Sequence, residues 1–243
     1  MHKFAVGIPS VPLDTDLDHC PVCARAKLHR AAHGRNSSKQ AIQCFQGISV
    51  DFGFMVQCSS NSEWVHQLTG LHGETCYCLI TDHYSRMLHG AVFCSKAPPI
   101  EFLNTWLAQY GLPNSVADKY VHFDLGGELG CCTDVVKLFQ QAGYAVEPTA
   151  PDSSHQNGPG ECPHRSIAEG LWAMLGGAAL ESKFWPYAFE HYLHLYNVTV
   201  HHSQSASPYT ILHGQQTKLE SSLDFWTSCL CLPSLSLCCQ IGQ

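Results

Sequence analysis

The pattern of hydrophobic and polar positions divides the chain into extended and helical stretches. Three early stretches are rich in β-branched and aromatic residues and are separated by polar, turn-prone links: 47–56, 75–81 and 87–94. This composition favours strands, and strands that follow one another closely in sequence favour antiparallel pairing. The pattern therefore predicts a three-stranded antiparallel meander in this part of the chain.

From residue 98 onward, helical and extended patterns alternate. Helices are predicted over 98–110, 134–142, 161–175 and 184–198, and strands over 120–123 and 144–149. Thr133 is the expected N-cap of the second helix and Gly143 its stop, whereas residues 151–160, with two prolines and two glycines, are expected to form a loop. The order β-β-β-α-β-α-β-loop-α-α predicts an α/β fold in which helices flank a mixed sheet.

Three parts are expected along the chain: a polar segment at 1–40, a folded core at 41–215 and a low-complexity tail at 216–243. Hydrophobic residues make up 45% of the chain, which is enough to form a core. No run of about 18 apolar residues occurs, and the N-terminal stretch is a poor signal peptide because Gly and Pro interrupt its apolar residues. We therefore expect an intracellular protein, nuclear or cytoplasmic, with no membrane partner.

The 14 cysteines raise the question of a disulfide framework. Such frameworks are typical of short secreted domains, which this chain does not resemble in length or leader. Cys76, Cys78 and Cys94 each lie within an apolar run. We expect all three to be reduced and buried.

Charge is distributed unevenly. The net charge is −7, but residues 1–40 hold six Lys or Arg against three Asp, so the rest of the chain carries a net charge of −10. A strongly acidic core attracts the phosphates of nucleic acid weakly. Any interaction of this core with DNA would depend on specific contacts rather than on broad electrostatic attraction.

Three acidic residues occupy positions that suggest chemistry. Asp51 lies within the first apolar strand, where a charge is costly unless it is paired or bound to metal. Asp124 ends the fourth strand and Glu161 begins a helix. The first and fourth strands of such a fold are neighbours, so the two aspartates would converge and the glutamate would close the site. Three carboxylates suit Mg²⁺ or Mn²⁺, and a pair of such ions supports in-line phosphoryl transfer.

Each acid taken alone also has an ordinary explanation. Asp124 precedes Leu-Gly-Gly and could be a turn residue, and Glu161 could simply favour the N-terminus of a helix. Two further acids, Asp82 and Glu128, lie near the same region of the chain. We expect Asp82 to orient the turn after its strand and Glu128 to lie just outside the metal ligands. Neither residue is expected to bind metal directly.

Several motifs together resemble the catalytic core of Copia-type (Pseudoviridae-like) retrotransposon integrases. Ser49-Val-Asp51, His122-Phe-Asp-Leu-Gly-Gly-Glu128 and His155-Gln-Asn-Gly-Pro-Gly-Glu161 are similar to the three parts of the family's D,D,E signature. Asp124 and Glu161 are separated by 36 residues, close to the family's spacing. The segments 80–86 and 207–214 resemble two further family motifs, and the resemblance spans roughly residues 20–215.

The resemblance implies a ribonuclease H-like fold, with a mixed five-stranded sheet flanked by helices, that carries out DNA integration. Asp51, Asp124 and Glu161 would then be both catalytic residues and ligands of Mg²⁺ or Mn²⁺, with two ions at the site. The implied reactions are trimming of the element's 3′ DNA ends and their transfer into target DNA, and a homo-oligomer is an expected partner.

The resemblance also implies three DNA-binding residues. Arg165 lies one turn beyond Glu161 and would contact a phosphate, although an arginine that is solvated or paired with Glu169 explains its presence equally well. Gln156 and Asn157 would shape the loop over DNA, or would serve only as turn residues.

Cys20 and Cys23 resemble the second half of the family's His-His-Cys-Cys zinc motif. A closed zinc site needs four ligands, and the 19 residues before Cys20 supply only His2 and the adjacent His19. We therefore interpret residues 1–40 as a truncated zinc-binding-like segment and do not expect zinc to bind. A second departure from the family is Cys162-Pro163-His164, where basic residues usually follow the third acid.

These observations leave three hypotheses. The first is an integrase core that is active with metal, and the second is an inactive remnant that keeps the fold and binds nucleic acid weakly. The acidic core, the incomplete zinc motif and the unusual tail favour the second, whereas the intact acidic triad favours the first. A cysteine- and histidine-rich metal-binding protein is a third hypothesis, which accounts for 14 Cys and 16 His but not for the order of the acidic motifs.

Overall fold

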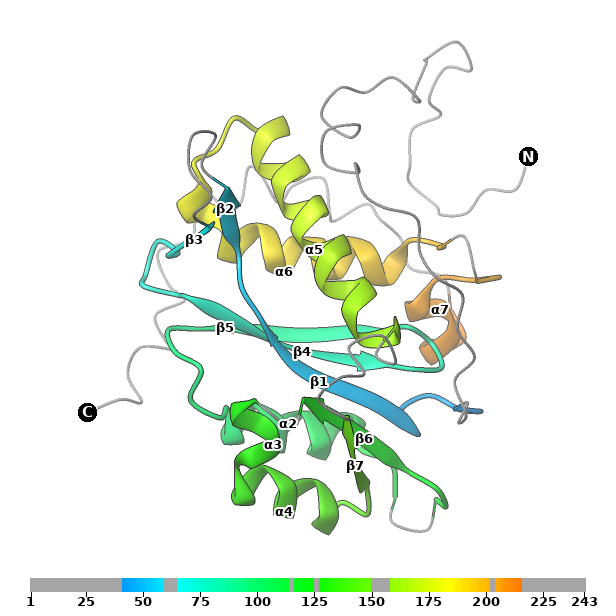
Figure 1. Cartoon of the computed structure of the whole chain (residues 1–243). Helices are drawn as coiled ribbons and strands as arrows, with labels where there is room; N and C mark the ends of the chain where they lie inside the picture. The colour runs from blue at the N-terminus through cyan, green and yellow to red at the C-terminus, as the bar shows by residue number, and fades with distance from the viewer. Residues whose placement is uncertain are drawn as a thin grey trace.

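A computed structural model describes residues 41–58, 65–113, 116–124, 127–149, 158–201 and 204–215. In these residues a five-stranded mixed sheet is flanked by helices, as the sequence predicts (Figure 1). The strand order is β5-β4-β1-β6-β7, and a separate two-stranded sheet pairs β2 with β3. The strands are β1 (Gly47–Gly53), β2 (Val56–Cys58), β3 (Val65–Gln67), β4 (Cys76–Asp82), β5 (Leu88–Phe93), β6 (Tyr120–Asp124) and β7 (Ala145–Thr149).

Strand β1 is the centre of the large sheet. It pairs antiparallel with β4 on one side and parallel with β6 on the other. The first three long strands form the predicted meander, and β6 and β7 extend it with parallel pairs. The predicted adjacency of the first strand to the one that ends at Asp124 is confirmed.

Helices cover both faces of the sheet. They are α2 (Ile100–Tyr110), α3 (Glu128–Cys131), α4 (Thr133–Gln141), α5 (Gly158–Gly177), α6 (Trp185–Val198) and α7 (Pro208–His213), with a 3-10 turn, η2 (Ser182–Phe184). In Figure 1, α5 and α6 lie above the sheet, and α2, α3 and α4 lie below it. None of the helices in the described part of the chain has the length and hydropathy needed to cross a bilayer.

Two hydrophobic cores follow from the alternation of side chains along the strands. Val50 on β1 and Phe123 on β6 face α2 and α4 and pack with Phe139. The opposite face carries Leu79 on β4, which packs with Leu171 of α5 and other apolar residues of α5 and α6. The helices of the second core contact β1, β4 and β5. On the same face of the sheet, β1, β6 and β7 carry the polar residues Ser49, His122 and Glu147.

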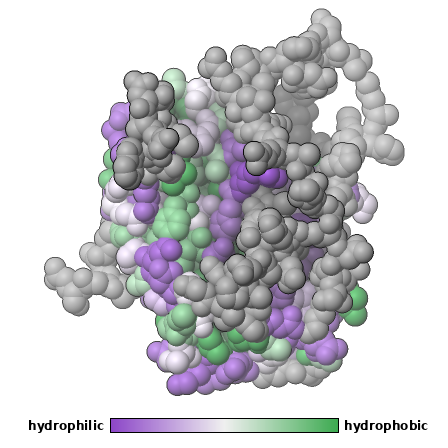
Figure 2. Space-filling view, viewed as in Figure 1, coloured by the Kyte–Doolittle hydropathy of each residue, from purple (hydrophilic) through white to green (hydrophobic). Residues whose placement is uncertain are grey.

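Helix α4 shows how one helix serves core and solvent at once. Its buried residues are Val135 and Phe139, four positions apart, while most of its other residues are partly or fully exposed. Figure 2 shows hydrophilic residues over the lower end of the molecule, where Figure 1 places this helix. The pattern is that of an amphipathic helix seated on a sheet.

Some predicted boundaries were wrong. The first strand ends at Gly53 instead of reaching residue 56, and residue 56 begins the short β2. Helix α5 begins at Gly158, within the stretch 151–160 that was predicted to be a loop. The prediction followed from the glycines and prolines of this stretch, which are typical of turns. Pro159 lies in the first turn of the helix, where a backbone nitrogen needs no partner within the helix, whereas Pro163 lies inside it.

The prediction for the cap of α4 was also wrong. Thr133 is its first helical residue, and Cys132 stands at the N-cap position with no side-chain hydrogen bond. The reason is that α3 ends at Cys131, so residue 132 links two helices and its amide bonds back to the carbonyl of Leu129. Gly143 follows the helix with φ of 80°, which suits its predicted role as the stop.

Cysteine burial follows the expectation in part. Cys76 and Cys78 are buried thiols on β4, and burial raises the pKa of both. Cys94 is exposed, so the prediction that it is buried was wrong. It lies one residue past the end of β5, where the apolar run of the sequence continues but the sheet does not.

Asp82 has the structural role that the sequence predicts. Its carboxylate accepts hydrogen bonds from the amide of Phe45 at 2.7 Å and from the amide and hydroxyl of Ser85. These bonds form the turn between β4 and β5 and tie it to the segment before β1. Oε2 of Glu128 lies 3.4 Å from Nζ of Lys96 in an ion pair whose two side chains are exposed. The expected position of Glu128 just outside the metal ligands stays a prediction.

Candidate metal centre

Asp51 lies near the end of the central strand. It is opposite Leu79 on β4, and its side chain is 50% exposed. Its Oδ1 atom accepts a hydrogen bond of 2.7 Å from the amide of Phe52. The charge is therefore not buried, although its strand is apolar. Half of the side-chain surface is exposed among the described residues, and this leaves the carboxylate accessible to a ligand.

The backbone of Asp124 comes close to that of Asp51. Val50 and Phe123 are partners in the parallel pairing of β1 with β6, so the next residue on each strand is Asp51 and Asp124. Neighbouring strands lie about 4.8 Å apart. The sheet thus brings the two backbone positions together, while the side chain of Asp124 lies outside what the structure describes.

Helix α5 brings the third acid to the same end of the sheet. It contacts β1 and β4, and Glu161 lies in its first turns. His164, three residues later, lies with Nε2 3.5 Å from Oδ2 of Asp51. Residues three apart on a helix share a face, so the backbone of Glu161 is one turn from this contact. The side chain of Glu161 also lies outside the described residues.

His164 is a site residue that sequence reasoning missed. Its Nδ1 atom lies 3.0 Å from the hydroxyl of Tyr77, and the two rings stack with centroids 5.6 Å apart. Tyr77 is buried on β4 and also packs on Phe189 of α6. Burial, followed by the charge of Asp51, raises the pKa of Tyr77, so its hydroxyl stays protonated near neutral pH. Tyr77 therefore holds the imidazole against Asp51.

A sequence signal for this arrangement exists at Gly53. Gly53 pairs with Tyr77 across β1 and β4, and a Cβ atom at residue 53 would overlap the tyrosine ring. Glycine inside a strand often marks a close approach of another group. The signal does not reveal which group approaches, so the link to His164 needed the tertiary structure.

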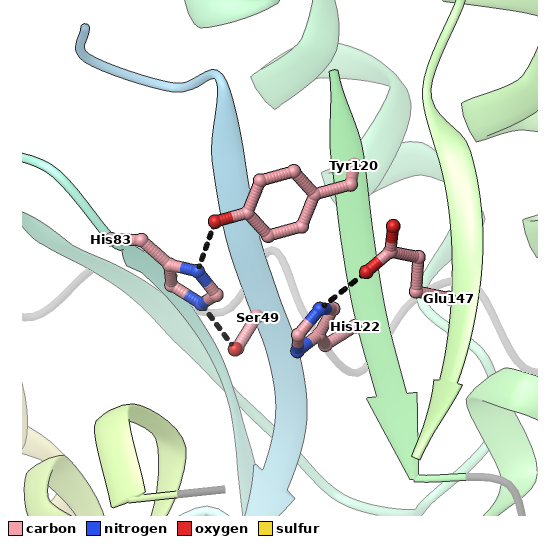
Figure 3. A network of polar contacts seen from close by, with 5 residues as sticks. All are labelled: Ser49, His83, Tyr120, His122 and Glu147. Carbon is pink, nitrogen blue, oxygen red and sulfur yellow. Dashed lines mark hydrogen bonds and ion pairs between the residues drawn. The ribbon is translucent and has the colours of Figure 1, made fainter. Parts of the chain in front are cut away.

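A polar network lies next to the acids on the part of the sheet formed by β1, β6 and β7 (Figure 3). Ser49 donates to or accepts from Nε2 of His83 at 2.7 Å, and Nδ1 of His83 lies 3.2 Å from the hydroxyl of Tyr120. His122 lies 3.1 Å from Oε2 of Glu147. Ser49 is two residues before Asp51 on the same strand, so both share one face of the sheet.

The central histidine of the network is neutral near pH 7, mainly because it is buried. Burial, and then the nearby His122, lowers the pKa of His83 to about 3. A neutral imidazole with both nitrogens engaged, to Ser49 and Tyr120, is a fixed hydrogen-bonding element. The network thus forms a hydrogen-bonded polar surface beside Asp51, built from β1, β6, β7 and the turn after β4.

The remaining predicted site residues are placed as follows. Arg165 is half exposed, and its Nε lies 3.9 Å from Oε1 of Glu169, one turn further along α5. This is the pairing that offers an ordinary explanation for the arginine. Gln156, Asn157, Cys20 and Cys23 lie outside the described residues.

The donors in the described part of the site suit a divalent cation, although they do not complete a site. Within that part of the chain, no group of three His, Cys, Asp or Glu side chains could hold a metal ion. Asp51 offers an accessible carboxylate, and His164 offers a ring nitrogen on the same side. Carboxylate oxygen and imidazole nitrogen are both common ligands of divalent metals. Two further carboxylates would have to come from Asp124 and Glu161.

Comparison with known proteins supports the fold. One chain of the simian T-cell lymphotropic virus intasome, solved in complex with the PP2A regulatory subunit B56 gamma, matches 78% of this chain with a TM-score of 0.54 and 12% identity. The match covers 62% of that chain. The catalytic core domain of BIV integrase matches 69% of this chain, and 93% of its own length is covered, with a TM-score of 0.46 and 14% identity. No protein-family model and no curated protein matches the sequence.

The likeness to the intasome chain concerns the fold alone, because the identity is 12%. The predicted fold class is confirmed: the chain has a mixed five-stranded sheet flanked by helices, of the ribonuclease H-like type.

Proposed function

We propose that the chain is an integrase-type catalytic core that cleaves and transfers DNA strands with Mg²⁺ or Mn²⁺. The observation that carries this proposal is the register of β1 with β6, which sets Asp51 beside Asp124, together with the contact of α5 with Asp51 through His164. Asp51, Asp124 and Glu161 would be the metal ligands and catalytic residues. The core would span residues 41–215.

Each of the chain's own groups has a defined part in this reaction. When bound, a pair of divalent ions would activate the attacking oxygen and stabilise the leaving one. Asp51 presents Oδ2 toward solvent and His164, while Oδ1 is held by the amide of Phe52. The hydrogen bonds of His83 with Ser49 and Tyr120 hold polar side chains beside Asp51. Arg165, Gln156 and Asn157 would contact DNA.

The substrates and partners belong to the same proposal. The resemblance to Copia-type retrotransposons supports element ends and target DNA as substrates, and a homo-oligomer as the working form. The intasome chain in the comparison comes from simian T-cell lymphotropic virus, and this chain spans 62% of its length. The type of reaction, the DNA substrates and the homo-oligomer are therefore all parts of the proposal.

A core that binds nucleic acid weakly without catalysis is the second candidate. The net charge of −10 after residue 40 favours it, because such a surface repels phosphates. The ion pair of Arg165 with Glu169 also occupies the arginine expected to contact DNA. Both candidates share the fold and differ in the outcome of one measurement.

That measurement is metal-dependent cleavage and strand transfer by the full chain on a branched DNA substrate, which does not require recognition of specific ends. Asp51→Asn, Asp124→Asn and Glu161→Gln should each lower the rate by at least about 100-fold, since even groups behind the ligands of a metal site contribute about 10- to 100-fold. Asp118→Asn is the matched control, because Asp118 is exposed in the turn at the other end of β6.

The control position also tolerates its substitution. Asp118 has φ of 57°, a left-handed conformation that asparagine adopts readily. Activity in the unmodified chain and in Asp118→Asn, with loss in all three acid variants, would support the proposal. A folded chain that binds DNA in gel-shift assays but shows no metal-dependent cleavage would establish the second candidate instead.

A further inference from the structure

The distance between His164 and Asp51 suits two ligands of one cation better than it suits a direct hydrogen bond. Its Nε2 lies 3.5 Å from Oδ2 of Asp51, which is longer than a usual N–H···O hydrogen bond. Two atoms bound to one tetrahedral ion at about 2.1 Å lie about 3.4 Å apart, and neighbouring ligands of an octahedral ion lie about 3.0 Å apart. The observed separation is therefore close to that of two ligands of one cation.

The orientation of the imidazole is set from behind. Histidines that bind metal usually engage their second ring nitrogen with an outer partner, which fixes the tautomer and the ring plane. Here the partner is the hydroxyl of Tyr77, 3.0 Å from Nδ1 of His164. When Nδ1 carries the proton and donates to this hydroxyl, Nε2 presents a lone pair toward Asp51. Tyr77 is 1% exposed, so its hydroxyl is a fixed partner.

We infer that His164 is a nitrogen ligand of the cation held by Asp51, and that it makes this centre select Mn²⁺ over Mg²⁺. The inference rests on the proposed function for the presence of a cation and adds its coordination and selectivity. Mg²⁺ prefers oxygen ligands and keeps its water, whereas first-row transition ions accept imidazole. Replacing one oxygen ligand by His164 therefore penalises Mg²⁺ more than Mn²⁺.

Mn²⁺ binding to the full chain is the direct test. Mn²⁺ is the suitable probe because the chain has 14 cysteines, and thiolates select softer ions such as Zn²⁺. Pulsed electron paramagnetic resonance of bound Mn²⁺ should show coupling to a ligated ¹⁴N nucleus. The coupling should disappear in His164→Asn and persist in His194→Asn, a matched change on the exposed side of α6.

Calorimetric titration measures the selectivity. In His164→Asn the dissociation constant for Mn²⁺ should rise at least about 10-fold, while that for Mg²⁺ should change less than about 3-fold. Tyr77→Phe removes the partner of Nδ1 and should weaken Mn²⁺ in the same direction by a smaller factor. Circular dichroism melts of each variant establish that the fold is kept, and Tyr77→Phe provides a second route if His164→Asn unfolds.

Each outcome has a defined meaning. Bound Mn²⁺ without nitrogen coupling, equal weakening of both metals in His164→Asn, or no binding of Mn²⁺ at all would overturn the inference. Nitrogen coupling from a chain that does not cleave DNA would keep the inference and overturn the proposed function. Cleavage that depends on Asp51 but shows unchanged metal selectivity in His164→Asn would overturn the inference alone.

Discussion

The ring of Tyr77 occupies the space above the backbone of Gly53, where a side chain would otherwise stand. The two residues are partners across β1 and β4, and a Cβ atom at residue 53 would overlap Cζ and the hydroxyl of the tyrosine. The same hydroxyl reaches Nδ1 of His164. A small residue on the central strand thus allows a buried tyrosine to reach the candidate metal centre.

Gly53→Ala should therefore destabilise the chain and disturb the centre. Forcing a methyl group into a packed site costs about 1–3 kcal/mol, which urea unfolding followed by tryptophan fluorescence would measure. Gly176→Ala is the control, because a Cβ atom there meets nothing within 4 Å and alanine favours a helix over glycine. Equal stability of the two variants would show that Tyr77 moves aside without cost.

Asn197 fastens the end of α6 to β5. Its Oδ1 accepts from the amide of Leu88 at 2.9 Å, and its Nδ2 donates to the carbonyl of Leu88 at 2.7 Å. Asn197→Ala would leave two buried backbone groups unpaired, at a cost on the order of 2–4 kcal/mol. Asn104→Ala, on the exposed side of α2, should change stability by less than about 0.5 kcal/mol. Denaturant midpoints of the two variants compare them directly.

Stability should fall as the pH drops below about 6.5, through His83. Its pKa in the folded chain is lowered to about 3, by burial first and by His122 next, so between these values only the unfolded chain binds a proton. The stability contributed by neutral His83 is present above pH 6.5 and is lost toward pH 3, by up to about 1.4 kcal/mol per pH unit.

The measurement for His83 is a set of urea midpoints at pH 7 and pH 5. His83→Gln lacks the titrating group, so its loss of stability between the two pH values should be smaller than that of the unmodified chain. His89, whose pKa is lowered to about 4 mainly by burial, adds a second contribution that both chains share. An equal loss in both chains would mean that His83 is protonated in the folded chain at pH 5.

The thiols of β4 should be protected from alkylation. Cys76 and Cys78 are buried, and burial raises the pKa of both, which lowers the fraction of reactive thiolate. Iodoacetamide followed by peptide mass spectrometry should leave both unmodified in buffer and modify both in urea. Cys132 is partly exposed and serves as the internal reference. Rapid labelling of Cys78 in buffer would indicate local opening of the sheet.

Local patterns were sufficient to predict most of the strands and long helices. The apolar, β-branched run around Val50 and the spacing of Ile167, Leu171 and Leu175 each bury one face of a single element, so they can be recognised within a few residues. The meander and the adjacency of the first and fourth strands followed as well, because such an order of elements has few allowed topologies. The short hairpin of β2 and β3 has three residues in each strand, too few to leave such a pattern.

The backbone convergence of Asp51 and Asp124 could likewise be predicted, because strand adjacency determines it. Whether their side chains and that of Glu161 converge stays a prediction, as do the roles of Gln156, Asn157 and Arg165. The helix start at Gly158 was missed because residues 158–160 resemble a loop locally, and helix formation there is supported by packing further along α5.

The sequence by itself determined the class of fold and the central position of the strand with Asp51, since these depend on periodicity and residue type, and it proposed the three acids. Only the tertiary structure decided that His164 meets Asp51, that Tyr77 stands behind it and that Ser49, His83 and Tyr120 form one network. The physical reason is that these contacts join residues from separate strands, turns and helices. Their geometry depends on how the elements pack, which no local pattern along the chain encodes.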